Sequence, residues 1–301
     1  MTMTKEEMTA KIVGGDGFIA ALDQSGGSTP KALKGYGVDE GAWSNDEQMF
    51  ALIHEMRARI ITSPSFASGK VIGAILFERT MDGTIAGKPT PQALIDRGVV
   101  PFVKIDKGLE PEANGVQLMK PMPDLDSLLS RARDLGVFGT KERSVINLAN
   151  HEGIAAIVKQ QFEVADQVLG HGLVPIIEPE VNIKSAERVQ ADIILLHELE
   201  QALDELPGEK RVMLKLSIPA KPGLFTPLVR HPNVLRVVAL SGGYSREEAC
   251  RELSMNPGMI ASFSRALLSD LRHGQSREEF DRTLGQAIDE IYDASTRKMI
   301  L

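Results

Sequence analysis

Short apolar segments recur along the whole chain and are separated by stretches with a different hydrophobic period. Most of these segments are rich in Val, Ile, Leu or Phe, and several alternate apolar with polar positions, which is typical of β-strands. One example is "RVMLKLSIP", where Lys215 lies in the middle of the alternation. The eight segments are residues 17–23, 71–78, 99–106, 138–146, 172–180, 211–218, 233–240 and 258–265. We predict a strand at each.

The stretches between these segments have helical spacing, with apolar residues at i, i+3 and i+4. One of them, "EGIAAIVKQQFEVADQVLGHG", ends with Gly170 and Gly172, which predict the end of the helix. Three others begin with the Ser-x-x-Glu pattern of a capping box. These pairs are Ser44 and Glu47, Ser245 and Glu248, and Ser276 and Glu279.

Alternating strands and helices predict an α/β protein with a parallel sheet covered by helices. Eight strands are the number that closes a (β/α)₈ TIM barrel, which typically needs about 250 residues. No Pro/Gly/Ser-rich linker interrupts the 301 residues, so we expect a single barrel domain over residues 1–301. Segments 24–70 and 79–98 are the expected insertions. A doubly wound open sheet is the alternative, less favoured because no Gly-x-Gly-x-x-Gly follows the first strand.

Composition places the chain among soluble globular proteins, with 43% hydrophobic and 25% charged residues. The net charge of −7 does not suggest a nucleic-acid partner, and the longest apolar runs are too short to span a membrane. The start of the chain is charged and lacks the apolar core of a signal peptide. Cys250 is the single cysteine, which fits a reducing cytoplasm. A homo-oligomer is compatible with all of this.

Polar side chains gather where the predicted strands end. In a (β/α)₈ barrel the active site is built at the carboxyl ends of the strands. Any one of these residues alone is better explained as a solvated strand end or a structural ion pair, but together they favour an active site. They are Asp23, Lys104, Asp106, Lys141, Arg143, Glu178, Glu180, Lys215, Ser241, Ser264 and Arg265.

The chemistry that these residue types allow is narrow. The sequence contains no His-x-His, His-Glu-x-x-His or Cys-x-x-Cys, so we expect no metal, and nothing points to another cofactor. Lys215 becomes a nucleophile when neutral, a state that burial and a neighbouring cation such as Lys141 favour. Attack on a ketone gives a carbinolamine, which Glu178 is placed to dehydrate. The resulting imine is an electron sink that permits carbon–carbon cleavage.

Two Gly/Ser-rich turns point to phosphate. "LSGGY" follows the seventh predicted strand and contains Ser241, Gly242 and Gly243, whose backbone amides are suited to cradle an anion. Arg265 follows the eighth strand, and the loops after strands 7 and 8 frequently form the phosphate site of this fold. The turn "DQSGGSTPK" after the first strand, together with Lys104, is the candidate for a second phosphate.

A set of motifs in order along nearly the whole chain resembles the class I, Schiff-base fructose-bisphosphate aldolases, most closely their short bacterial form. These motifs include "GFIAALDQSGGSTPKALK", "TSPSF", "NGVQLMKP", "GLVPIIEPEVNI", "VMLKL", "VLRVVALSGGYSRE" and "ASFSRAL". The resemblance implies reversible, metal-independent cleavage of fructose 1,6-bisphosphate to dihydroxyacetone phosphate and glyceraldehyde 3-phosphate, in glycolysis and gluconeogenesis. Sugar bisphosphates and triose phosphates would then be its partners.

The resemblance also implies roles for individual residues. Lys215 would form the Schiff base, Glu178 would be the acid/base with Glu180 assisting, and Asp23 would act on the C4 hydroxyl. Lys141 would supply the neighbouring cation, and Arg143 would contact the substrate. The remaining residues would bind phosphate: Ser241, Gly242, Gly243, Ser264 and Arg265 on the dihydroxyacetone side, and Ser25, Ser28 and Lys104 on the aldehyde side.

The chain departs from the longer animal members of that family at three places. Ala32 stands where they carry arginine, Glu142 stands where they carry tryptophan, and the chain ends "STRKMIL" without a terminal tyrosine. The group that protonates the enamine is therefore open, with Glu178 a candidate. Two alternatives to this function remain: a transaldolase-like Schiff-base enzyme acting on other sugar phosphates, and a sugar-phosphate-binding protein without catalysis.

Overall fold

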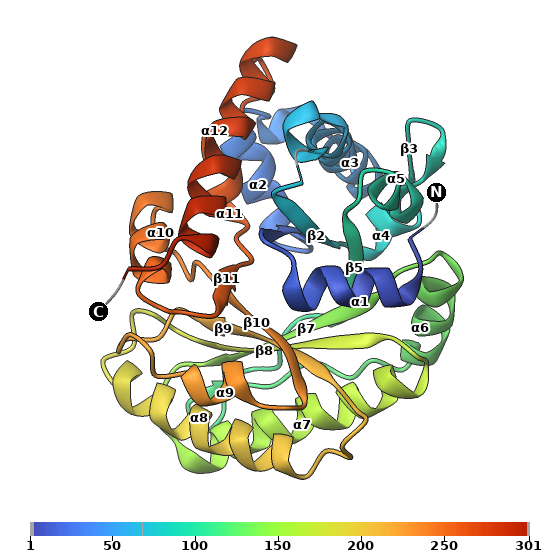
Figure 1. The fold of residues 1–301 in the computed structure, drawn as a ribbon. Coiled ribbons are helices and arrows are strands. Elements are labelled where there is room, and N and C mark those ends of the chain that lie inside the picture. Colours follow the sequence, from blue (N-terminus) through green and yellow to red (C-terminus); the bar gives the residue numbers. More distant parts are fainter. Residues whose placement is uncertain (1–2, 68, 300–301) are drawn as a thin grey trace.

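Eight parallel strands form one sheet that curls into a nearly closed barrel (Figure 1). The computed structural model describes residues 3–67 and 69–299. The strand order follows the sequence, as expected for a (β/α)₈ barrel. The strands are β1 (Phe18–Leu22), β2 (Val71–Leu76), β5 (Val100–Lys104), β7 (Gly139–Ile146), β8 (Val174–Val181), β9 (Val212–Ser217), β10 (Val234–Leu240) and β11 (Met259–Ala261). All eight predicted strands are therefore confirmed.

The first and last strands meet through a backbone hydrogen bond, in which the Ala21 amide donates to the Phe263 carbonyl at 3.2 Å. The eighth strand is shorter than the predicted 258–265. It ends at Ala261, because Ser264 begins the short helix α11 (Arg265–Leu268). Ser264 therefore lies just before this helix and Arg265 is its first residue, and both line the cavity at the barrel mouth.

The barrel interior is filled by apolar side chains below a layer of charged ones. Alternate residues of a strand point to the same face, so Phe102 and Lys104 share the inner face of β5. Ile176 and Met213 likewise lie one inward position before Glu178 and Lys215. This apolar floor is continued by Ile19, Val100, Val174, Val238 and Ile260. The alternation itself thus places the charged residues in the mouth.

Helix α1 (Lys5–Gly14) closes the opposite end of the barrel (Figure 1). Its Met8 and Ile12 are buried and belong to the same apolar cluster as the barrel interior. The guanidinium of Arg236 at the start of β10 holds the end of this helix by donating to the Val13 carbonyl at 2.6 Å. Solvent is thereby excluded from the floor of the barrel.

A second, larger apolar layer lies between the outer face of the sheet and the surrounding helices. In Figure 1, α7 and α8 cover one side of the barrel, and α2, α3 and α12 lie near β1 and β2. The helices are α2 (Ser28–Tyr36), α3 (Asp46–Thr62), α4 (Glu78–Met81), α5 (Thr90–Ile95), α6 (Leu125–Asp134), α7 (His151–Gly170), α8 (Arg188–Asp204), α9 (Thr226–Arg230), α10 (Arg246–Ser254) and α12 (Arg277–Thr296). The predicted helix end near Gly170 is confirmed.

Two of the three predicted capping boxes are confirmed, at the starts of α10 and α12. The prediction at Ser44 is wrong by one residue. Asn45 caps α3 by accepting from the Gln48 amide at 2.9 Å, and the Gln48 side chain accepts from the Ser44 amide at 2.7 Å. Both overlapping patterns fit the capping rule, and the helix begins after the second.

The two expected insertions carry additional elements. Residues 24–70 contain α2, α3 and the 3₁₀ turns Glu40–Ala42 and Pro64–Ala67. Residues 79–98 contain the hairpin β3 (Thr84–Ile85) and β4 (Lys88–Pro89) followed by α5. Outside both insertions, the short strand β6 (Val116–Gln117) pairs antiparallel with β7. These additions lengthen the loops that lead into the barrel mouth.

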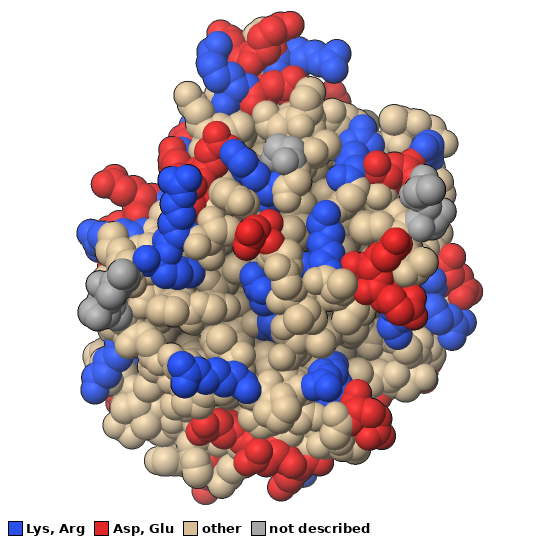
Figure 2. All heavy atoms as spheres, viewed as in Figure 1, with Lys and Arg blue, Asp and Glu red and all other residues tan. Residues whose placement is uncertain are grey.

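Charged side chains of both signs are interspersed over the face shown in Figure 2. This face therefore lacks the continuous basic stripe that is typical of nucleic-acid-binding surfaces. Among residues 3–67 and 69–299, no helix combines the length and the apolar character needed to cross a membrane.

Candidate active site

A cavity of about 680 Å³ opens at the carboxyl ends of the strands. It brings together all the site residues predicted from the sequence except Gly243, which lies beside it. The predicted residues that line it are Asp23, Ser25, Ser28, Lys104, Asp106, Lys141, Arg143, Glu178, Glu180, Lys215, Ser241, Gly242, Ser264 and Arg265. The cavity is large enough for a small phosphorylated metabolite.

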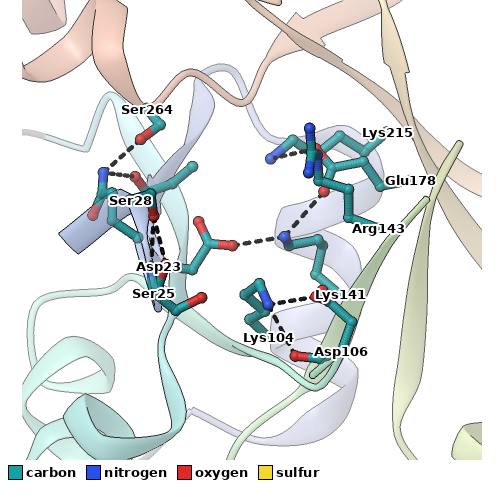
Figure 3. A network of polar contacts seen from close by, with 12 residues as sticks. Asp23, Ser25, Ser28, Lys104, Asp106, Lys141, Arg143, Glu178, Lys215 and Ser264 are labelled. Atoms are coloured by element: carbon teal, nitrogen blue, oxygen red, sulfur yellow. Dashed lines mark hydrogen bonds and ion pairs between the residues drawn. The ribbon is translucent and has the colours of Figure 1, made fainter. Parts of the chain in front are cut away.

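Lys141 from β7 lies at the centre of a buried charge network (Figure 3). Its Nζ is 2.7 Å from Oδ2 of Asp23 and 3.0 Å from Oε2 of Glu178. The side chain of Lys141 is only 3% exposed, so these two carboxylates take the place of water around its ammonium group. One lysine therefore bridges the ends of β1 and β8 across the mouth.

This network determines the charge states of Asp23 and Lys141. Burial opposes ionisation of Asp23, but the ammonium groups of Lys141 and Lys215 prevail and lower its pKa far below the usual range. Burial likewise disfavours the Lys141 cation, but the carboxylates of Asp23 and Glu178 outweigh it and raise the pKa of Lys141. At neutral pH the site thus holds an ionised Asp23 and a permanent ammonium at Lys141.

Lys215 from β9 points at the other oxygen of the shared carboxylate. Its Nζ is 3.3 Å from Oε1 of Glu178, and both side chains are about 95% buried. The ladder between β8 and β9 pairs Ile176 with Met213 and Ile177 with Leu214, one step before these two residues. Glu178 thus stands between two lysines and is in direct contact with the amine of Lys215.

Two further ion pairs lie at the edge of the cavity. Lys104 Nζ is 2.5 Å from Oδ1 of Asp106 and donates to the Asp106 carbonyl at 2.9 Å. Burial lowers the pKa of Lys104, and the carboxylate of Asp106 partly compensates. Arg143 Nε is 2.5 Å from Oε2 of Glu180, with the guanidinium partly exposed to the cavity. Both pairs hold a cation at the cavity wall.

The turn after β10 has the backbone geometry of an anion cradle. Gly242 has φ of +60°, and a Cβ there would lie 2.7 Å from Cγ2 of Ile183. A Cβ at Gly243 would lie 3.7 Å from the guanidinium of Arg265, so the turn and this cation are adjacent. Ser241 is buried in the same turn. The Gly242 position therefore has room for glycine only, and the turn lies next to a positive charge.

A second turn, after β1, is organised by its own serines. The Ser25 amide donates to Oγ of Ser28 at 2.9 Å, and this hydroxyl donates to the Ser25 carbonyl at 2.8 Å. In Figure 3, Ser25, Ser28 and Ser264 lie on one side of the pair of Asp23 and Lys141, and Lys215 lies on the other.

The cavity also contains residues that were not predicted from the sequence. Gln24 lies inside the "DQSGGSTPK" turn and contacts Ser264, which follows the last strand of the barrel. Lys31 and Ser262 line the cavity as well. Behind Gln24 lies Arg57, fully buried on the apolar face of α3. Its position between Ile53 and Ile60 was the available signal, since a charge on a core-facing helix position needs a specific partner.

Glu142 lies on the outer face of β7, opposite to its neighbours Lys141 and Arg143. It is fully buried, and neither carboxylate oxygen has a hydrogen-bond partner. The next outward-facing residue of β7 is Ser144, whose hydroxyl accepts a hydrogen bond from the Gln161 side chain at 3.1 Å. Burial, with a contribution from the carboxylate of Asp106, raises the pKa of Glu142 well above its usual value. The buried environment therefore favours the protonated form of this carboxyl.

No group of three or more His, Cys, Asp or Glu side chains within residues 3–67 and 69–299 is arranged to hold a metal ion. The acidic residues of the cavity are instead paired with lysines and arginines.

The sequence pattern of one protein family, described as fructose-bisphosphate aldolase class-I, matches residues 5–204. The chain belongs to this family. The matched range includes Asp23, Lys141 and Glu178, whereas Lys215 and the turn after β10 follow it along the chain. The match therefore covers the three strands, β1, β7 and β8, that carry the charge network.

Solved structures with similar folds cover almost the whole chain. A fructose-bisphosphate aldolase from Plasmodium falciparum, solved with TRAP and a small-molecule inhibitor, matches with a TM-score of 0.79 and 20% identity over 98% of this chain and 95% of that one. A Corynebacterium glutamicum protein matches with a TM-score of 0.51 and 14% identity over 96% and 92% of the two chains. At these identities the likeness is one of fold, and its coverage is too large to be confined to residues 5–204.

Proposed function

We propose that the protein is a fructose-bisphosphate aldolase (EC 4.1.2.13) that cleaves fructose 1,6-bisphosphate reversibly through a Schiff base on Lys215, in glycolysis and gluconeogenesis. The observation that carries the proposal is the contact between the Lys215 amine and Glu178, 3.3 Å apart in a buried site next to a second lysine. Membership of the class-I aldolase family supports the same reaction type.

In the first step, the neutral amine of Lys215 attacks the C2 ketone of the substrate. Glu178 touches this amine through Oε1 and is placed to give a proton to the departing hydroxyl, so that water leaves and a protonated imine remains. Lys141 stays charged, and its ammonium group holds the other oxygen of the Glu178 carboxylate in place. A carboxyl beside a lysine amine is the arrangement that this dehydration requires.

In the second step, the C3–C4 bond breaks and its electrons move into the imine, forming an enamine. Asp23 accepts the proton of the C4 hydroxyl, which becomes the aldehyde of glyceraldehyde 3-phosphate. The lowered pKa of Asp23 supports this role because its carboxylate is ionised at neutral pH before the substrate arrives. The enamine then takes a proton at C3, and hydrolysis returns the Lys215 amine and releases dihydroxyacetone phosphate.

Two cationic regions of the cavity support a bisphosphate substrate. We assign the phosphate of the dihydroxyacetone half to Ser264, Arg265 and the turn Ser241–Gly242–Gly243. We assign the phosphate of the aldehyde half to Ser25, Ser28 and Lys104. Arg143 contacts the substrate, and Glu180 assists by orienting its guanidinium. A second phosphate site favours fructose 1,6-bisphosphate over monophosphates.

Borohydride trapping tests the proposal. Reduction in the presence of dihydroxyacetone phosphate should inactivate the protein and leave one adduct on Lys215, located by peptide mass spectrometry. Lys215→Met should abolish trapping and cleavage, whereas Lys159→Met, at an exposed lysine of α7, should change neither. An adduct on another lysine, or cleavage that EDTA abolishes, would contradict the mechanism.

Comparison of substrates tests the assignment of the two phosphates. The value of kcat/KM for fructose 1,6-bisphosphate should exceed that for fructose 1-phosphate by at least about tenfold, because a phosphate contact with a buried cation contributes on the order of 1.5–3 kcal/mol. Equal values would show that the aldehyde-side site does not bind phosphate.

A further inference from the structure

Gln24 links the first strand of the barrel to the segment after the last strand, at the cavity mouth. It follows β1, and its Nε2 donates to Oγ of Ser264, 240 residues later, at 2.5 Å. The same nitrogen lies 3.4 Å from the Ala21 carbonyl. Because both residues line the cavity, the contact lies beside the space that a substrate would occupy.

The orientation of the Gln24 amide is determined by the guanidinium behind it. Arg57 NH2 donates to the backbone carbonyl of Gln24 at 2.5 Å and to its Oε1 at 3.3 Å. A guanidinium is only a donor, so the amide oxygen must face Arg57 and the amide nitrogen must face Ser264. Arg57 is anchored in turn by Oγ1 of Thr80, at 2.7 Å from NH1.

Arg57 is unusual because it is fully buried without an ion pair among the described residues. Burial lowers its pKa to about 10, with the charge of Asp23 opposing the change. A buried cation is strongly destabilising unless hydrogen bonds compensate for the loss of water. Its two strong contacts go to Gln24 and Thr80, so its main structural effect is to hold the Gln24 turn.

The direction of the bond to Ser264 has a chemical consequence. A serine hydroxyl has one hydrogen to donate and two lone pairs to accept with. Because Gln24 donates to this hydroxyl, the hydrogen of Ser264 stays free for an anion in the cavity. Arg265 follows directly in the chain, and the anion that fits both groups is a phosphate.

We propose that Gln24 is a positioning residue that turns the Ser264 hydroxyl toward the phosphate of the dihydroxyacetone half, and that Arg57 holds Gln24 in that orientation. The inference rests on the proposed function. It also accounts for a neutral amide at this position. A carboxylate accepts only, so it would capture the hydrogen of Ser264 and repel the phosphate.

The test measures borohydride trapping at increasing concentrations of dihydroxyacetone phosphate and, separately, of dihydroxyacetone, which lacks the phosphate. Gln24→Glu should raise the half-saturating concentration of dihydroxyacetone phosphate at least tenfold and change the maximal trapping rate by less than about twofold. The half-saturating concentration of dihydroxyacetone should stay unchanged. Gln201→Glu, at an exposed position of α8, controls for the added charge and should behave as wild type.

A double-mutant cycle separates positioning from general damage. Gln24→Ala should raise the half-saturating concentration of dihydroxyacetone phosphate severalfold in the wild type, but by less than twofold in a Ser264→Ala background, because the effect passes through that hydroxyl. Equal effects in both backgrounds, or equal losses for the two ligands, would overturn the inference while leaving the proposed function intact. A wild-type protein that is not labelled on Lys215 would overturn both.

Discussion

The buried carboxyl of Glu142 predicts an unusual dependence of stability on pH. Both of its oxygens lack partners and the residue is fully buried, so burial raises its pKa in the folded protein well above the unfolded value of about 4.3. Above that unfolded value, the unfolded chain releases a proton that the folded chain keeps. The group therefore lowers the free energy of unfolding as pH rises, until the pH reaches the raised pKa.

The magnitude follows from the linkage of one proton. Each pH unit between the unfolded pKa and the raised folded pKa lowers the free energy of unfolding of the wild type by about 1.4 kcal/mol through this residue. Glu142→Gln has nearly the same shape and no titrating proton. Its free energy of unfolding relative to the wild type should therefore increase by about 1.4 kcal/mol for each pH unit in this window, whatever constant offset the amide introduces.

Urea denaturation followed by circular dichroism at pH 5, 6 and 7 measures the difference. Glu163→Gln, which removes an exposed carboxylate from α7, is the matched control and should show a nearly constant offset. Parallel stability curves for the wild type and Glu142→Gln would refute the reasoning, because they would mean that Glu142 is ionised in the folded protein as in the unfolded one.

Three further substitutions probe the site and its supports. Lys141→Met should lower kcat by about 10²–10³-fold and the free energy of unfolding by about 3–5 kcal/mol, because it leaves Asp23 and Glu178 buried without their shared cation; kinetics and urea melts measure both. Gly242→Ala should raise KM by about tenfold with a smaller change in kcat, because the added methyl group does not fit at φ of +60° beside Ile183 and would distort the anion cradle. Ser245→Ala should cost about 1 kcal/mol in thermal unfolding by removing the α10 cap, with KM unchanged.

The eight strands could be predicted because each carries its signal within a few consecutive residues. The period of two that places Met213 on the inner face also places Lys215 there, and the same holds for Ile176 and Glu178. Local capping patterns predicted the starts of α10 and α12 for the same reason. The predicted start of α3 was wrong by one residue because two overlapping patterns, one beginning at Ser44 and one at Asn45, both satisfy the capping rule. The local sequence does not distinguish between them.

Contacts between distant parts of the chain were decided only by the tertiary structure. The bridge from Gln24 to Ser264 exists because the barrel closes, and nothing near either residue indicates its partner. The residues of the site were predicted one by one, but the way in which Lys141 shares its charge between Asp23 and Glu178 depends on distances of about 3 Å across three strands.

The amino-acid sequence by itself thus determined the order of strands and helices and which residue types face the mouth of the barrel, since both follow from local periodicity. The three-dimensional packing determined which charges pair, which carboxyl has a raised pKa, and which hydroxyl accepts a hydrogen bond from Gln24. Those properties depend on burial and on the direction of individual hydrogen bonds. Glu142 and Arg57 illustrate this, because each is an ordinary charged residue in the sequence and becomes consequential only through the neighbours that enclose it.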